Sequence, residues 1–191
     1  MGTFDTLMNR NKDFAAHQFV TSSSLKPTLD ETLRSAKALI IACADPRDDP
    51  AYVLGFEPGE AVVLRNIGGR ITPGTLQMMA LLGRVGQVAG ENPGGRDEYH
   101  LIVLQHTDCG IKRLAETPDL LADYFGIDKE GLPAKAVTDP RAAVAIDVAA
   151  LRANPALPGE WLVSGLVYDV ATGLVETVVP PSPLRAPSGV K

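Results

Sequence analysis

The stretch Lys37–Arg47, KALIIACADPR, decides how this chain can fold. Its first half is a run of small and branched apolar side chains, which is typical of a strand buried on both faces of a parallel sheet. Reactive and charged side chains follow directly: Cys43, Asp45 and Arg47 occupy alternate positions, and Pro46 separates the last two. Ligands of open α/β sheets gather beyond the carboxyl ends of the strands. The stretch therefore predicts a functional site where this strand ends.

The rest of the chain alternates between short apolar runs and helical patterns. Buried strands are expected at residues 61–66 and 100–106, and a late strand with a hairpin at residues 161–168 and 174–179. Helices are expected between them, at residues 28–35, 49–56, 75–88, 111–116, 118–125 and 139–153. This alternation predicts an α/β fold with a mostly parallel central β-sheet flanked by helices.

Three parts of the chain differ in character. Residues 1–35 carry an imperfect apolar stripe and predict an N-terminal helical arm. Residues 36–179 hold all the predicted strands of the sheet and both cysteines, so they form the expected catalytic domain. Residues 180–191 begin with Pro-Pro-Ser-Pro and predict an extended, proline-rich tail.

Composition excludes several classes of partner. The 191 residues carry a net charge of −5 and no basic cluster, so a nucleic acid is not an expected partner. No apolar run reaches the length of about 20 residues that a membrane-spanning helix requires, so no membrane contact is expected. Two cysteines are too few for a disulfide framework, and the first residues resemble neither an export signal nor a transit peptide. We therefore expect a cytoplasmic protein.

Both cysteines of the chain fall at the same edge of the predicted sheet. Cys43 ends the first strand, and the next strand but one ends in His106 and is followed by Cys109. Two thiolates and an imidazole suit zinc, and a catalytic zinc commonly keeps three protein ligands and one open position. Each residue alone has a plainer interpretation: a buried strand cysteine, a strand-end histidine, or a Cys43–Cys109 disulfide. Their joint placement favours the metal site.

Three motifs resemble the β-class carbonic anhydrases. CADPR (43–47) and HTDCG (106–110) match C-x-D-(S/A)-R and H-x-x-C-G, and RNIGGR (65–70) lies where that family has R-N-A-G-N. The resemblance covers residues 37–168 and implies the family's fold and one Zn²⁺ held by Cys43, His106 and Cys109. It also implies a catalytic pair, Asp45 and Arg47, and a substrate pocket at Asn66, Ile67, Gly68 and Gly110.

The same resemblance implies reversible hydration of CO2 to bicarbonate and a proton by zinc-activated water. In this family the arginine of the pair holds the aspartate away from the metal, and in the inactive form of some members the aspartate binds the zinc. Members are generally homodimers or dimers of dimers, with the N-terminal arm lying across the partner. The homodimer and the small-molecule substrate are therefore expectations for this chain too.

Departures from the family pattern leave the substrate open. Pro46 stands in place of a small residue, Ile67 in place of alanine, and Gly69 in place of asparagine. The bulkier, more apolar wall fits a close alternative, hydrolysis of carbonyl sulfide or carbon disulfide with the same zinc site. A third alternative is a zinc-stabilised scaffold without activity, in which Asp45 would be the fourth ligand. Retention of Arg47 as the competing partner of Asp45 argues against that closed site.

Overall fold

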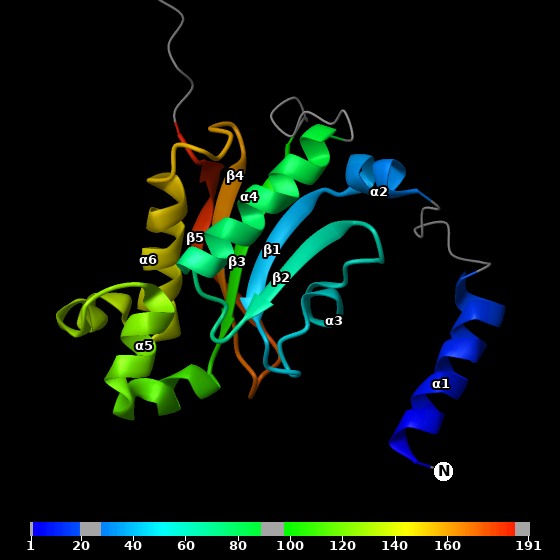
Figure 1. The fold of residues 1–191 in the computed structure, drawn as a ribbon, viewed down its shortest axis with the longest axis horizontal. Coiled ribbons are helices and arrows are strands. Elements are labelled where there is room, and N and C mark those ends of the chain that lie inside the picture. Colours follow the sequence, from blue (N-terminus) through cyan, green and yellow to red (C-terminus); the bar gives the residue numbers. More distant parts are fainter. Residues whose placement is uncertain (1, 20–27, 89–97, 186–191) are drawn as a thin grey trace, which may run out of the picture.

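A five-stranded sheet forms the centre of the protein (Figure 1). The computed structural model describes residues 2–19, 28–88 and 98–185. The strands are β1 (Ala38–Cys43), β2 (Ala61–Asn66), β3 (His100–His106), β4 (Leu162–Tyr168) and β5 (Val175–Pro183). Their order across the sheet is β2-β1-β3-β4-β5; the first four are parallel, and β5 pairs antiparallel with β4. The α/β fold predicted from the sequence is confirmed.

Helices flank this sheet and begin at clear sequence signals. Asp49 and Asp139 accept hydrogen bonds from the first free N–H groups of α3 and α6, and each is followed by a proline at the first helical position. The predicted helices are all present, and a 3₁₀ turn, η4, was not predicted. The helical elements are α1 (Thr3–Asp13), η1 (Phe14–Phe19), α2 (Leu29–Ser35), α3 (Pro50–Leu54), α4 (Pro73–Val88), η3 (Gly110–Glu116), α5 (Pro118–Phe125), η4 (Lys129–Lys135) and α6 (Pro140–Arg152).

Strand β1 lies at the heart of the core, and all six of its residues are buried. Leu39 and Ile41 pack on one face of the sheet with residues of α4 and α6, whereas Ile40 packs on the opposite face, in a cluster that includes Leu104. The parallel register places Cys43 of β1 opposite Asn66 of β2. The carboxyl ends of β1, β2 and β3 consequently meet at one edge, where the predicted site residues lie.

The C-terminal strand is longer than the sequence pattern indicated. We expected a strand that ends at Val179 and a loose tail from Pro180, but β5 continues to Pro183. Prolines are tolerated here because β5 is an edge strand, whose outer N–H groups have no partner strand. Leu184 is buried and its N–H donates to Trp161, so the start of the expected tail belongs to the domain. Residues 186–191 lie outside the described ranges.

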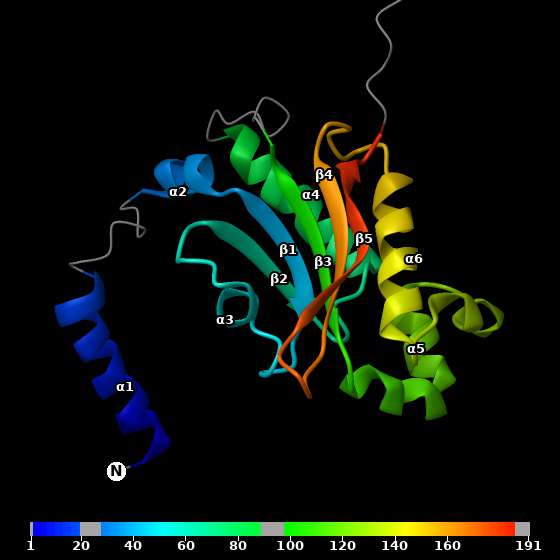
Figure 2. The ribbon, with the colours of Figure 1, turned by 180° about the vertical axis from the view of Figure 1, so that it is seen from behind.

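The N-terminal helix α1 stands apart from the sheet in both views (Figures 1 and 2). None of its residues is buried, and Phe4, Leu7 and Met8 are exposed. The helix expected in the arm is therefore present, although residues 20–27 are not among those described. Among the described helices, none has the length and apolar character needed to cross a bilayer.

Candidate metal centre

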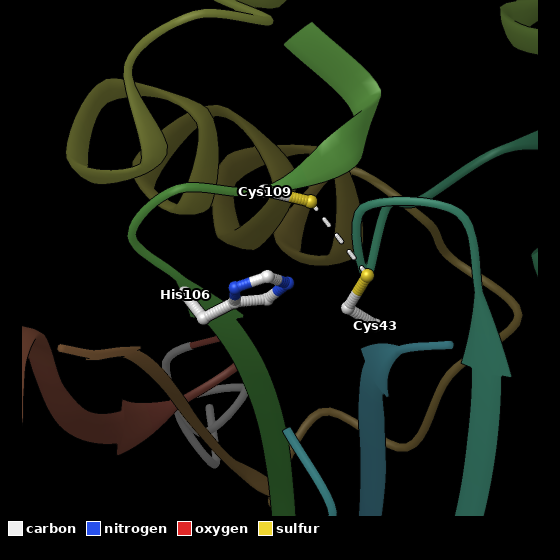
Figure 3. Close-up of side chains that lie close together, drawn as sticks. All are labelled: Cys43, His106 and Cys109. Carbon is white, nitrogen blue, oxygen red and sulfur yellow. Dashed lines mark hydrogen bonds between the residues drawn. The ribbon is translucent and has the colours of Figure 1, made fainter. Parts of the chain in front are cut away.

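Three potential metal ligands converge at the carboxyl edge of the sheet (Figure 3). Cys43 ends β1, His106 ends β3, and Cys109 immediately precedes η3. One ligand atom from each side chain lies within 4.8 Å of the other two, and the two Sγ atoms are 3.6 Å apart. Neither cysteine forms a disulfide. The structure thus brings together all three residues that the sequence predicted as ligands.

The donor atoms fit a zinc ion. The Nε2 atom of His106 is buried and has no hydrogen-bond partner among the described residues, while Nδ1 lies 2.8 Å from the carbonyl oxygen of Thr107. A metal-binding histidine typically has this arrangement, because a second partner on the other nitrogen fixes the ring and leaves one lone pair for the ion. Two sulfurs and one imidazole nitrogen form a ligand set that zinc prefers.

The two thiols differ in their electrostatics. The hydrogen bond from Cys109 lowers the pKa of Cys43 to about 4, and N–H groups of Asp45 and Gly68 contribute to the same shift. The pKa of Cys109 is raised, because its proton is held by the Cys43 thiolate and because the group is buried. Cysteine binds metals as the thiolate, so the lowered pKa of Cys43 favours the form that a cation requires.

Asp45 and Arg47 form a tight pair beside this cluster. Arg47 donates from Nε to one carboxylate oxygen of Asp45 at 3.0 Å and from Nη2 to the other at 2.8 Å. These bonds to Arg47 hold the pKa of Asp45 well below its usual range. Oδ2 of Asp45 lies 3.8 Å from Nε2 of His106, so the carboxylate lies next to the candidate ligands while the guanidinium binds both of its oxygens.

The loop after β2 forms a second wall of the centre. Gly68 donates its N–H to the sulfur of Cys43 at 3.2 Å, and the exposed side chain of Ile67 precedes it. The polar atoms of Asn66 are engaged within the loop, with Arg70 and Thr75. Gly110 opens η3 with free space where a Cβ would stand. A pocket of about 210 Å³ borders the cluster and is lined by Gly68, His106, Cys109 and other residues.

Gly69 allows this loop to approach the end of β1. It has φ +62°, and a Cβ there would lie 2.7 Å from the carbonyl oxygen of Leu104 and 3.0 Å from the nitrogen of Cys43. Glycine adopts this backbone conformation at low cost and leaves room for both neighbours. The position that appeared in the sequence as a lost asparagine is thus required for close packing.

Several residues at the centre were not singled out in the sequence. Asp48 is fully buried and accepts the N–H of Cys43 at 3.1 Å, and burial raises its pKa to about 7. Arg65 donates to the carbonyl oxygens of Cys43 and Asp45. Asp108 accepts from Nη1 of Arg47 at 3.3 Å. The RNIGGR motif contains Arg65, but no spacing signal marks the two aspartates.

Comparison with known proteins identifies the family. The family described as carbonic anhydrase matches residues 38–124. The chain is 30% identical over 177 residues to a protein named beta-carbonic anhydrase 1 from Mycobacterium tuberculosis, covering 91% of this chain and 100% of the relative. It belongs to the β-carbonic anhydrase family.

Two further similarities show the range of this family. A carbon disulfide hydrolase from Acidianus is 28% identical over 185 residues, covering 78% of this chain and 84% of the relative. The crystal structure of carbonic anhydrase from Streptococcus mutans has a TM-score of 0.62 and 29% identity, covering 93% of this chain and 98% of that one. The proteins similar to this chain are thus named for two different reactions, that of carbonic anhydrase and the hydrolysis of carbon disulfide.

Proposed function

We propose that this β-carbonic anhydrase family member binds one Zn²⁺ on Cys43, His106 and Cys109 and catalyses the reversible hydration of CO2 to bicarbonate and a proton. The observation that carries this proposal is the convergence of the three ligand atoms beside a carboxylate already held by an arginine. Membership of the family supports the same conclusion.

The reaction divides between the ion and the chain. Cys43, His106 and Cys109 would hold a zinc ion, which would act as a Lewis acid; such an ion lowers the pKa of bound water to about 7 in well-studied zinc sites. Asp45 has a depressed pKa, so it is ionised at neutral pH and acts as a hydrogen-bond acceptor that orients the attacking water. Arg47 holds both oxygens of that carboxylate, which keeps the carboxylate directed and prevents it from becoming a ligand itself.

Pro46 restricts the loop that carries this pair. Its ring fixes φ and removes one N–H, so Asp45 receives its backbone hydrogen bond from the N–H of Arg47, at 2.9 Å. The N–H of Asp45 in turn points to the sulfur of Cys43, at 3.4 Å. Hydrogen bonds therefore connect Cys43, Asp45 and Arg47 within a turn of five residues that Pro46 stiffens.

Hydrolysis of carbonyl sulfide or carbon disulfide is a second candidate. The side chain of Ile67 is 47% exposed on the loop after β2, next to Gly68 of the pocket lining, and an apolar side chain near the pocket suits an apolar linear substrate. The similarity to a protein named carbon disulfide hydrolase favours the same alternative. The ligands and the Asp45–Arg47 pair would serve either reaction, so the two candidates differ only in the pocket wall.

We also propose that the protein functions as a homodimer in the cytoplasm. Helix α1 exposes Phe4, Leu7 and Met8 and buries none of its residues. An apolar stripe of this kind gains stability when a partner covers it. Light scattering after size exclusion should give twice the chain mass, and deletion of residues 1–19 should reduce it to one chain mass.

One purified sample tests the function. Metal analysis should give about one zinc per chain, stopped-flow measurement should show CO2 hydration, and sulfide release from carbonyl sulfide and carbon disulfide should be slower. Asp45→Asn should retain zinc and lose most of the turnover, whereas Asp30→Asn, the same change on exposed α2, should retain both. Absence of zinc would refute the proposed metal site, and bound zinc without turnover would refute the proposed enzymatic activity. Sulfide release faster than CO2 hydration would favour the second candidate function.

A further inference from the structure

One peptide group connects the metal centre with helix α5. The carbonyl oxygen of Ile67 accepts a hydrogen bond from the hydroxyl of Tyr124 at 2.8 Å. The N–H of Gly68, which belongs to the same planar peptide group, donates to the sulfur of Cys43 at 3.2 Å. Because a peptide group is rigid and planar, a partner that fixes its oxygen also fixes the direction of its N–H.

This peptide needs a restraint from outside its own loop. Gly68 has φ +81° and Gly69 has φ +62°, and two consecutive glycines leave the backbone many alternative conformations. A Cβ on Gly68 would lie 2.7 Å from a methyl carbon of Ile111, so a stiffer residue cannot take its place without displacing that side chain. The direction of the Gly68 N–H is thus set by its hydrogen-bonded neighbours rather than by the loop sequence.

Tyr124 is well placed to supply that restraint. It lies on α5, and its ring packs edge-on against Phe125, with the ring centroids 5.2 Å apart. Burial raises the pKa of the Tyr124 hydroxyl well above its usual range, so the group remains a donor. A hydrogen bond to the oxygen of a peptide also polarises its N–H, an effect of roughly 10–30% per bond in a chain of hydrogen bonds.

We propose that Tyr124 is a positioning residue of the metal centre, which fixes and polarises the Ile67–Gly68 peptide so that its N–H donates to the ligand sulfur of Cys43. This role rests on the proposed zinc site. Groups that hydrogen-bond to metal ligands orient them and tune their donation to the ion, and their loss typically costs 10–100-fold in metal affinity or activity. Tyr124 is separated from the ligand Cys43 by one peptide group, so we expect a loss near tenfold, the lower limit of this range.

The first test uses the wild-type protein loaded with ¹¹³Cd in place of zinc. The amide proton of Gly68 should show scalar coupling to the metal, transmitted through the hydrogen bond to the sulfur of Cys43. Absence of this coupling in a cadmium-loaded protein would overturn the proposal. A wild-type chain that bound neither cadmium nor zinc would instead refute the proposed zinc site, so the two failures are distinguishable.

The second test removes only the hydroxyl. Tyr124→Phe keeps the ring and its packing, and Tyr52→Phe makes the same change at a side chain that is 89% exposed. For Tyr124→Phe we expect about tenfold faster zinc loss to a chelator, a weaker ¹¹³Cd coupling, and a sulfur-to-metal charge-transfer band of the cobalt-loaded protein at longer wavelength. The band should move because a thiolate that loses a hydrogen bond gives up electron density more easily.

Tyr52→Phe should behave as wild type in all three measurements. A purely structural role for Tyr124 would lower the melting temperature without moving the charge-transfer band, and that result would overturn the proposal. Identical zinc release, coupling and band position in Tyr124→Phe and wild type would overturn it as well.

Discussion

Replacing Asp147 should reveal how the loop of the metal centre is anchored to the core. Arg70 follows the glycine pair of that loop and reaches Asp147 on α6, with Nε and Oδ2 2.6 Å apart. Both side chains are only 1% exposed, and Gln105 donates a further hydrogen bond to the same carboxylate oxygen. Asp147→Leu removes the carboxylate and leaves a buried guanidinium that cannot lose its proton.

The expected cost follows from the geometry. Two unit charges about 4 Å apart at an effective dielectric constant of 20 attract each other by about 4 kcal/mol, and breaking one partner of a buried pair typically costs about 3–5 kcal/mol. Arg70→Met should cost less, about 2–3 kcal/mol, because burial already raises the pKa of Asp147 and the stranded carboxyl can bind a proton. The double variant should cost less than Asp147→Leu alone, since no charge is left unpaired.

Urea unfolding of the zinc-loaded proteins at equal chain concentration measures these values, with Trp161, the only tryptophan, as the fluorescent probe in the core. The cost of Arg70→Met should decrease from pH 7 to pH 5, because protonation of the stranded carboxyl is then easier. The cost of Asp147→Leu should not decrease, because this variant has no carboxyl at position 147 that could take up a proton. A cost below about 1 kcal/mol for Asp147→Leu, or single costs that simply add in the double variant, would refute the reasoning.

Two further predictions concern the loops around the ligands. The pKa of buried Asp48 is raised to about 7, so the folded metal-free protein binds a proton more tightly than the unfolded chain and loses stability as pH rises from about 4 to 7. Urea unfolding should therefore show that the free energy of unfolding of Asp48→Asn, relative to that of wild type, increases by up to about 4 kcal/mol across that window. Parallel pH profiles of the two proteins would contradict this. Gly69→Ala should destabilise the protein by more than about 1–2 kcal/mol and weaken zinc binding, because its Cβ would crowd Leu104 and Cys43. Gly55 is the control, because it also has a positive φ, +72°, but no atom lies within 4 Å of its Cβ. Gly55→Ala should therefore show only the cost of the backbone conformation, and calorimetry should give normal zinc binding.

Much of the fold was predictable because it depends on local patterns. The run Ala38–Cys43 is apolar at every position, which is typical of a strand buried on both faces. The candidate ligands Cys43 and His106 end such strands and Cys109 follows closely, so topology alone brings the three to one edge. The positions of these three residues in space could therefore be predicted from their positions at the ends of apolar strands.

The missed residues depend on contacts between segments that are far apart in the sequence. Tyr124 lies 57 residues from the carbonyl group that it binds, and Arg70 lies 77 residues from Asp147. No periodicity encodes such pairs. Asp48 is close to Cys43 in sequence, but no apolar pattern around it indicates that this carboxylate is fully buried. The prolines of β5 indicated a tail because their tolerance depends on the strand being at an edge.

The two edges of the sheet differ in whether they can accept another strand. Strand β5 carries Pro180, Pro181 and Pro183, which lack the N–H that a ladder needs, so pairing beyond that edge is interrupted. Strand β2 contains no proline, so the N–H groups on its outer side, at alternate residues, remain available to a further strand. The side chain of Arg65 in this strand donates to the carbonyl oxygen of Cys43. Growth of the sheet by strand addition, whether in an ordered assembly or in aggregation during refolding, is therefore directed to β2, the edge strand that leads into a loop of the candidate metal centre.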